Sequence, residues 1–221
     1  AKLLIAEDAP VPSAQNNSDY IKYLSDTIYQ LTKNADYQTM ILFNSLVMIE
    51  QVYSQLRETD LFDQRDILAQ GITGNRDKIL KQFSGGKNSI LLGASSFWEG
   101  IDLPESALEL LIITRLPFDS PDEIMNRAHN KLLQQQGKNP FYHSELPKAT
   151  MRLRQGIGRL LRTEDDHGVA VVLDPRLQTR RYGKTILSSL PTDLPVNSKK
   201  TADLISITQK FLRNGKEDKV N

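Results

Sequence analysis

The sequence predicts an α/β protein of three layers, in which helices cover both faces of a mainly parallel sheet. The first observation is that short apolar runs alternate with amphipathic stretches along most of the chain. Such runs are typical of strands that are buried on both faces. The second observation is the composition: 39% of the 221 residues are hydrophobic and 25% are charged, so the chain can bury a sizeable core.

The first part of the chain contains two strand–helix units. The apolar run Leu3–Ala6 predicts a strand, and the turn-rich segment Asp8–Ser18 separates it from an amphipathic helix over Asp19–Thr32. Thr39–Phe43 predicts a buried strand because it is almost entirely apolar, and Leu46–Leu56 has the periodicity of a helix.

The middle of the chain continues this alternation. Asp66–Gln70 predicts a strand and Arg76–Phe83 a helix, which Ser84-Gly85-Gly86 ends. Ser89–Leu92 and Leu108–Thr114 predict two further strands. Because α/β sheets bind ligands beyond the carboxyl ends of their strands, we expect chemistry in the segments that follow these runs.

Residues 120–150 depart from the pattern and are predicted to be a helical insertion. Asp122–Gln136 has the periodicity of a helix, and Gly137–Pro147 is predicted to be a loop because it is rich in glycine, proline and aromatic residues. Phe141, Tyr142 and His143 could stack on bases, or they could pack in a core.

The end of the chain is predicted to lie outside the main domain. After a strand over Val169–Leu173, two prolines mark Leu190–Val196 as a linker, and an amphipathic helix over Thr201–Leu212 precedes a polar tail. We therefore expect an α/β domain over residues 1–191, followed over residues 192–221 by a linker, a C-terminal helix and a tail.

Composition excludes several kinds of site. The net charge of +1 neither requires nor excludes nucleic-acid binding, and the absence of cysteine excludes disulfides, cysteine-ligated zinc and iron–sulfur clusters within this chain. The three histidines are dispersed, so we expect no metal site. No apolar run approaches the ~18–20 residues of a membrane span and no signal peptide opens the chain, so we expect a cytoplasmic protein without a membrane partner. Its start at Ala1 indicates a processed protein or an excised fragment.

One helical segment is suited to binding an anion. If Gln155–Arg162 is helical, the residues at offsets 0, 3, 4 and 7 share one face: Gln155, Gly158, Arg159 and Arg162. Leu153, Ile157, Leu160 and Leu161 then fall on the opposite, buried side. A solvated face would explain the arginines equally well, but it gives no reason for Gly158, which costs about 1 kcal/mol relative to alanine inside a helix. A glycine there suits the close approach of another surface or of a nucleotide.

A second segment offers small, hydroxyl and acidic residues directly after a strand. The chain leaves Ser89–Leu92 into Gly93–Pro104, which contains Ser95, Ser96, Glu99, Gly100 and Asp102. Serine hydroxyls and backbone N–H groups can bind a phosphodiester, and a carboxylate can bind a ribose hydroxyl or orient an arginine. A tight turn over a buried Trp98 is the alternative. Asp174 and Arg176 likewise follow a strand, either as a functional pair or as a structural ion pair.

Ser96–Pro104 resembles motif V of the superfamily 2 helicases and Gln155–Arg162 resembles motif VI, and both are most similar to the motifs of the DinG/XPD branch. The likeness runs from about Leu3 to Pro191. Besides Ser96–Pro104 and Gln155–Arg162, it rests on Leu42–Ser45, Arg115–Phe118, Asp119–Pro121, Leu146–Ala149, Leu173–Leu177, Arg181–Gly183 and Leu190–Pro191.

The resemblance implies a RecA-like domain of the P-loop NTPase type that has no Walker A loop of its own. The family's motor has two such domains, and the first holds ATP and Mg²⁺. This chain resembles the second: the sequence before Gly183-Lys184-Thr185 has Gln178 where a phosphate loop needs its first glycine. The implied partners are single-stranded DNA and the N-terminal RecA-like domain of the same polypeptide.

The resemblance also implies roles for individual residues. Arg159 and Arg162 would be arginine fingers that stabilise charge on the transferring phosphoryl group. The nucleotide side would include Gln155, Gly158, Glu99, Gly100 and Asp102. The residues expected to touch single-stranded DNA are Asn44, Ser45, Ser95, Ser96 and Phe97, although Phe97 could instead belong to the core.

The function expected from this resemblance is that of the C-terminal motor domain of a DinG-like ATP-dependent DNA helicase that unwinds DNA in repair or replication. The isolated chain is predicted to be inactive because it lacks the phosphate loop. The alternative is a non-catalytic RecA-like module that binds nucleic acid or a protein partner.

Overall fold

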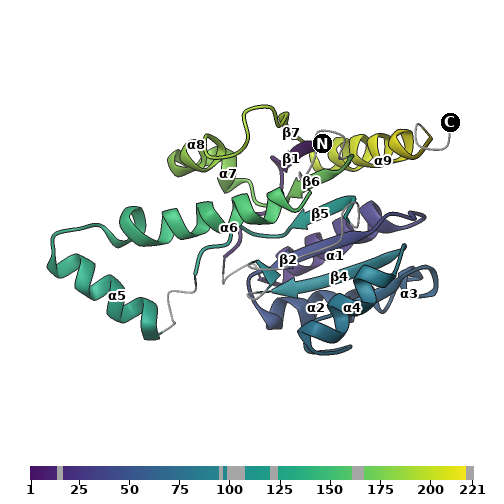
Figure 1. The fold of residues 1–221 in the computed structure, drawn as a ribbon, viewed down its shortest axis with the longest axis horizontal. Helices are drawn as coiled ribbons and strands as arrows, with labels where there is room; N and C mark the ends of the chain where they lie inside the picture. Colours follow the sequence, from purple (N-terminus) through teal and green to yellow (C-terminus); the bar gives the residue numbers. More distant parts are fainter. Residues whose placement is uncertain (14–16, 95–96, 99–107, 120–123, 161–166, 218–221) are drawn as a thin grey trace.

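The computed structural model describes residues 1–13, 17–94, 97–98, 108–119, 124–160 and 167–217, and it shows a single twisted sheet with helices on both faces (Figure 1). The sheet has seven strands in the order β3-β4-β2-β5-β6-β1-β7, and every strand pair is parallel. The predicted three-layer α/β class with a mainly parallel sheet is thereby confirmed.

Strands whose residues are apolar begin and end close to the predicted positions. The strands are β1 (Lys2–Ala6), β2 (Thr39–Phe43), β3 (Asp66–Ala69), β4 (Ser89–Ala94), β5 (Leu110–Ile113), β6 (Val169–Val172) and β7 (Val196–Lys199). The helices are α1 (Asn17–Thr32), α2 (Leu46–Leu56), α3 (Leu61–Gln64), α4 (Arg76–Gly85), α5 (Ile124–Gln135), the π-helix η2 (Phe141–Glu145), α6 (Leu146–Gly158), α7 (Arg176–Thr179), α8 (Arg181–Leu187) and α9 (Thr201–Glu217).

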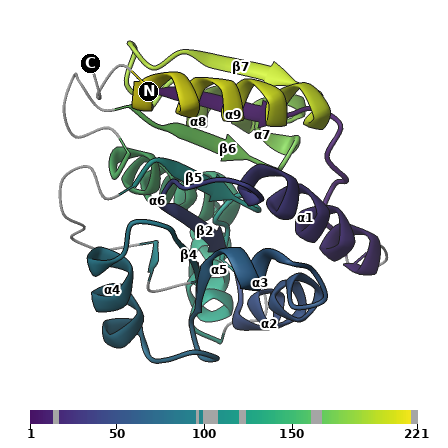
Figure 2. The same ribbon diagram turned by 90° about the vertical axis from the view of Figure 1, so that its right-hand side faces the viewer.

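Two apolar cores lie on the two faces of the sheet. Successive residues of a strand point to opposite faces, so Ile41 joins one core while Met40 and Leu42 join the other. The core that contains Ile41 is covered by α1, α2 and α9, and the opposite core by α4, α6 and α8 (Figure 2). Because both faces are covered, central strands such as β2 are buried along their whole length, which explains their unbroken apolar sequence.

The segment after Pro191 contributes an edge strand that the sequence did not predict. Val196–Lys199 form β7, which pairs in parallel with β1. Its residues are mostly exposed and polar because an edge strand has a neighbour on one side only, so no apolar run marks it. The predicted C-terminal helix is α9, and its Leu204 and Leu212 are buried in the core beside α1.

The predicted loop at Gly137–Pro147 is wrong from Phe141 onward. Phe141–Glu145 form one π-helical turn that runs directly into α6. Pro147 lies in the first turn of α6, and the chain is helical on both sides of it. A proline and several aromatics therefore do not break this helix.

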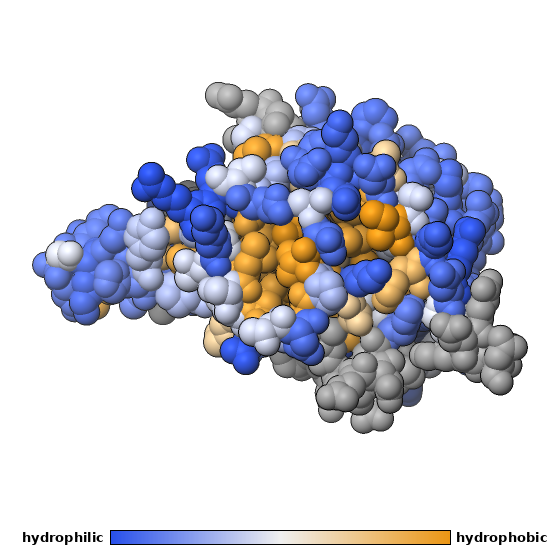
Figure 3. Space-filling view, turned by 90° about the horizontal axis from the view of Figure 1, so that it is seen from above, coloured by the Kyte–Doolittle hydropathy of each residue, from blue (hydrophilic) through white to orange (hydrophobic). Residues whose placement is uncertain are grey.

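The helical insertion projects away from the sheet. Figure 1 shows α5 and the start of α6 as an arm at the left. Within this arm, Asn130 Nδ2 on α5 donates a hydrogen bond of 2.9 Å to Oε1 of Glu145 on η2. Figure 3 shows this arm as hydrophilic, whereas apolar residues gather over the middle of the same view. None of the described helices is long and apolar enough to span a membrane.

Candidate nucleotide and nucleic-acid site

The two faces of α6 agree with the sequence prediction as far as the helix extends. Leu153, Ile157 and Leu160 are buried against the sheet, while Gln155 and Gly158 are exposed. The helix ends at Gly158, and Arg159 is its C-cap residue. The prediction that the helix continues through Arg159 is therefore wrong, and Leu161 and Arg162 lie outside the described residues. Gly158 is thus a terminal glycine, and a Cβ there would meet nothing within 4 Å.

Arg159 does not face solvent. It is only 9% exposed, and its Nη1 donates a hydrogen bond to the carbonyl oxygen of Phe97. This contact joins the end of α6 to the segment after β4. The guanidinium can be buried here because its hydrogen bond to the Phe97 carbonyl replaces part of the hydration that it loses.

The described residues after β4 belong to the core. Phe97 is fully buried, so its side chain does not form part of a nucleic-acid surface in this structure. Its ring lies so close to Gly93 that a Cβ on that glycine would clash with it. Trp98 is also buried and donates from Nε1 to the carbonyl oxygen of Phe43 at 2.9 Å. Ser95, Ser96, Glu99, Gly100 and Asp102 lie outside the described residues.

Asn44 and Ser45, which follow β2, each make a local structural contact. Asn44 Nδ2 donates to the carbonyl oxygens of Leu116 at 2.9 Å and Phe118 at 3.4 Å, which fixes its amide orientation. The Oδ1 atom of Asn44 is buried and accepts no hydrogen bond from any of the described residues. Ser45 is the N-cap of α2, and its Oγ accepts from the N–H of Met48 at 3.3 Å.

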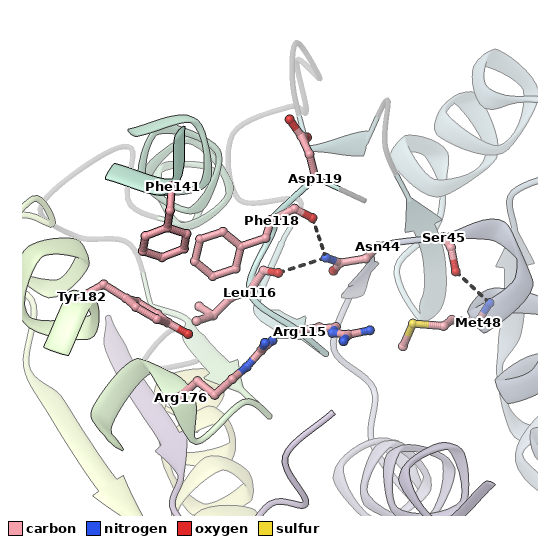
Figure 4. A pocket seen from close by; sticks show the side chains of 10 residues that line it. All are labelled: Asn44, Ser45, Met48, Arg115, Leu116, Phe118, Asp119, Phe141, Arg176 and Tyr182. Carbon is pink, nitrogen blue, oxygen red and sulfur yellow. Dashed lines mark hydrogen bonds between the residues drawn. The ribbon is translucent and has the colours of Figure 1, made fainter. Parts of the chain in front are cut away.

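These residues border a pocket at the carboxyl ends of β2, β5 and β6 (Figure 4). Its volume is about 460 Å³, within the roughly 300–1,000 Å³ that is usual for small-ligand pockets. The sequence did not identify Arg115 or Tyr182 as site residues. The signal for Arg115 was its place shortly after β5. The signal for Tyr182 was its place in the segment that follows β6. The pocket is lined by Asn44, Ser45, Met48, Arg115, Leu116, Phe118, Asp119, Phe141, Arg176 and Tyr182.

Asp174 and Arg176 form the ion pair that the sequence left open as an alternative. Asp174 is fully buried, and Arg176 Nη2 lies 2.6 Å from its Oδ2. Burial alone would lower the pKa of Arg176, but the hydrogen bond and the charge of Asp174 outweigh it and raise that pKa. Asp174 also accepts the backbone N–H of Leu116 at 2.9 Å, so the pair fixes the segment after β5.

A second ion-pair cluster connects that segment to α6. Asp119 contacts Arg152 Nη1 through Oδ1 and Lys148 Nζ through Oδ2, the latter at 3.5 Å. Burial of Asp119 would raise its pKa, but the bonds and charges of Arg152 and Lys148 lower it below its ordinary value. Both oxygens of the Asp119 carboxylate are therefore bound by cations of the same chain.

The aromatic residues of the insertion have different surroundings. Phe141 is half-buried and packs between Phe118 and Tyr182, with ring centroids 5.6 and 5.3 Å away. Tyr142 is 56% exposed, and His143 is exposed with Nδ1 3.0 Å from the carbonyl oxygen of Asn139. Only Phe141 lies in the pocket, so the predicted group of three stacking candidates is divided.

Comparison with known proteins gives a consistent family. The family model of the helicase C-terminal domain matches residues 28–193. The chain is 40% identical over 175 residues to the 3'-5' exonuclease DinG of Bacillus subtilis, covering 77% of this chain and 19% of that protein. It is 37% identical over 199 residues to the ATP-dependent DNA helicase YoaA of Haemophilus influenzae, covering 90% and 30% respectively.

Solved structures agree in fold. The structure of an XPD helicase superposes with a TM-score of 0.63 at 18% identity, covering 90% of this chain and 35% of that chain. The C-terminal domain of the DEAD-box protein Dbp5 superposes with a TM-score of 0.53 at 15% identity, covering 95% and 96%. The chain spans about a fifth to a third of the curated relatives it matches. It belongs to the helicase C-terminal domain family, and its sequence is similar to those of DinG and YoaA proteins.

Proposed function

We propose that this chain is the second RecA-like motor domain of a DinG-type ATP-dependent DNA helicase, which unwinds DNA in repair or replication in the cytoplasm. The observation that carries the proposal is the hydrogen bond from Arg159 to the carbonyl oxygen of Phe97. It joins the end of α6 to the segment after β4, and these are the two segments that resemble the family's nucleotide-cleft motifs.

In this proposal, ATP and Mg²⁺ are held mainly by an N-terminal RecA-like domain of the same polypeptide. The described part of this chain has no group of three histidine or acidic side chains that could bind a metal ion. It does offer donors that fit a phosphate: the exposed Gln155 and the guanidinium of Arg159 on one end of α6. When bound, ATP supplies the phosphoryl group that is transferred to water.

Arg159 acts by changing its hydrogen-bond acceptor. In the closed motor it leaves the carbonyl of Phe97 and donates to an oxygen of the γ-phosphate, together with Arg162. The exchange is favourable because a bond to an anionic oxygen is stronger than one to a neutral carbonyl. Gly158, which has open space around its Cα, lets the opposing domain approach the end of α6.

The segment after β4 connects the nucleotide to the DNA. Glu99, Gly100 and Asp102 belong to the nucleotide side of this segment, and Ser95 and Ser96 to the DNA side. Asn44 and Ser45 continue the single-stranded DNA track along the carboxyl edge of the sheet. Phe97 supports this track from the core rather than by touching DNA, because its side chain is fully buried.

The test is ATPase and strand-displacement activity of the intact protein that contains this chain, with and without single-stranded DNA. We expect DNA-stimulated ATP hydrolysis and unwinding by the intact protein, and no hydrolysis by the 221 residues alone. Hydrolysis by the 221 residues would contradict the assignment of ATP to another domain. DNA binding without any ATPase in the intact protein would favour the alternative of a non-catalytic module.

A further inference from the structure

Arg115 is a cation in the pocket that no acceptor in the described part of the chain occupies. It lies two residues after the end of β5, and Figure 4 shows its side chain between Arg176 and Met48. It makes no hydrogen bond or ion pair with any described residue. A half-buried guanidinium has five N–H donors, so Arg115 has donors that suit an anion.

The nearby carboxylates are already in use. Asp174 accepts from Arg176 through both carboxylate oxygens and from the N–H of Leu116, and Asp119 is held by Arg152 and Lys148. Burial and the positive charge of Arg176 both lower the pKa of Arg115. Counting the ion-pair partners of the lining residues, two carboxylates accompany four cations, and the surplus positive charge favours an anionic ligand.

Beside the two arginines, the pocket has an aromatic wall, which we define as Phe118, Phe141 and Tyr182. Their ring centroids are 5.3–5.6 Å apart, and all three are only half-buried. The wall and the guanidinium of Arg115 line the same cavity (Figure 4). A cationic group next to an aromatic surface is the combination by which proteins bind single-stranded nucleic acid.

A third group in the pocket lacks a donor. The Oδ1 atom of Asn44 is buried and has no hydrogen-bond partner in the part of the chain that the structure describes, while its Nδ2 is fixed by two carbonyls. A buried acceptor without a donor costs free energy. A ligand that carries both an anionic oxygen for Arg115 and an N–H or O–H group for Asn44 would satisfy both, and a nucleotide unit has these groups.

We propose that Arg115 binds a backbone phosphate of single-stranded DNA in this pocket, and that the adjoining nucleoside lies against the aromatic wall. This inference rests on the proposed function, and it adds the residue that holds the phosphate and the surface that receives the base. Arg176, fixed by Asp174, adds a second positive charge, and the site lies at the carboxyl edge of the sheet next to Asn44 and Ser45.

The salt dependence of DNA binding tests the phosphate contact. Binding of a fluorescent oligothymidylate to the intact helicase without nucleotide is measured by anisotropy over a series of salt concentrations. Each phosphate contact to a single strand contributes about −0.7 to the slope of log K against log[salt]. We expect Arg115→Gln to make the slope less steep by about 0.7. Arg115→Lys should keep the slope but bind more weakly, because lysine lacks the planar fork.

Arg57→Gln is the matched control for charge. Arg57 is exposed and caps the other end of α2, roughly 18 Å along the helix axis from Ser45 at 1.5 Å per residue. We expect it to leave the slope unchanged. An unchanged slope in Arg115→Gln would overturn the phosphate contact. A raised KM for ATP at saturating DNA in Arg115→Gln, with an unchanged DNA slope, would show that the phosphate belongs to ATP instead.

The aromatic wall has a separate test. Phe118→Leu should weaken binding of the oligothymidylate but not of an abasic oligonucleotide of the same length, and a thermal melt shows whether the variant is folded. Equal weakening of both ligands would overturn the contact between base and wall. If the unsubstituted intact protein binds no single-stranded DNA, the proposed function fails. If it binds and unwinds DNA but Arg115→Gln changes nothing, only this inference fails.

Discussion

Arg159 donates a hydrogen bond to the carbonyl oxygen of Phe97, a residue 62 positions earlier in the chain. The bond holds a guanidinium that is only 9% exposed, and it connects the end of α6 to the segment after β4. A movement of either segment must therefore change the surroundings of the other. In the proposed motor, this bond is the contact that Arg159 exchanges when the nucleotide cleft closes.

The first prediction concerns Arg159 itself. In the intact helicase, Arg159→Ala should reduce DNA-stimulated ATPase by about 10³–10⁵-fold, which is the range that arginine fingers contribute. Steady-state ATPase measured at saturating DNA checks this. Arg154→Ala is the matched control, because Arg154 is an exposed arginine on the same helix. Normal turnover in Arg159→Ala, with Arg154→Ala also normal, would remove Arg159 from the catalytic site.

The second prediction uses the open space at Gly158. Gly158→Ala should leave the free energy of unfolding unchanged or raise it by up to about 1 kcal/mol, because a Cβ meets nothing within 4 Å and alanine favours helix. We expect the same variant to lower the ATPase of the intact helicase, since the added methyl group keeps the opposing domain away.

Gly156→Ala provides the comparison for Gly158. Its Cβ would lie 3.5 Å from Leu42 and Trp98 in the core, which is ordinary contact, and it does not face the proposed cleft. Urea unfolding and ATPase are measured for both variants. If Gly158→Ala has the ATPase of the parent protein, close approach at this glycine is not needed.

The sequence predicts most of the fold because most of its signals are local. The β2 and α2 bounds are those predicted, Thr39–Phe43 and Leu46–Leu56, since an apolar run and a helical period are both visible within a few residues. The polar edge strand β7 has no such signal, because its existence depends on a free edge of β1 that lies far away in the sequence.

The site is less predictable because its contacts are not local. The sequence places Arg159 within a helix that it predicts to continue to Arg162, whereas α6 ends at Gly158 and the burial of Arg159 depends on a carbonyl on another segment. Arg115 and Tyr182 reach one pocket only because β5 and β6 are neighbours in the sheet. Asp174 and Arg176 are only two positions apart in the sequence, and their ion pair is local. Asp174 also accepts a hydrogen bond from the N–H of Leu116, which is 58 positions away.

The third prediction is a pH dependence carried by Asp119. Its pKa is lowered in the folded state, so the folded protein binds fewer protons than the unfolded chain near the unfolded pKa of about 3.9. The stabilisation is therefore fully present well above pH 3.9 and is lost as the pH falls through the folded pKa. Asp119→Asn should cost about 1–2 kcal/mol at pH 7, and this difference should shrink toward pH 3.

Urea unfolding at pH 7 and pH 3 measures this difference. Asp26→Asn is the control, because Asp26 forms an exposed pair with Lys22 at 3.1 Å whose removal should change the free energy of unfolding by less than about 0.5 kcal/mol. A pH-independent difference between Asp119→Asn and the parent protein would show that the charge of Asp119 does not stabilise the fold.

The fourth prediction concerns Arg65, a buried arginine at the amino end of the sheet. It is 4% exposed and donates to four backbone carbonyls, those of Thr32, Tyr37, Asn88 and Ser89. It therefore fastens the end of α1 and the starts of β2 and β4 to the start of β3. Burial lowers its pKa to about 10, which leaves it charged at neutral pH.

Arg65→Lys should cost about 2–4 kcal/mol, although it keeps the charge. A single ammonium group cannot reach carbonyls on three sides, and each buried carbonyl without a donor costs about 1–3 kcal/mol. Arg57→Lys, on an exposed arginine, should change the free energy of unfolding by less than about 0.5 kcal/mol. Equal urea midpoints for the two variants would mean that the charge of Arg65, and not its fork of donors, holds these strands together.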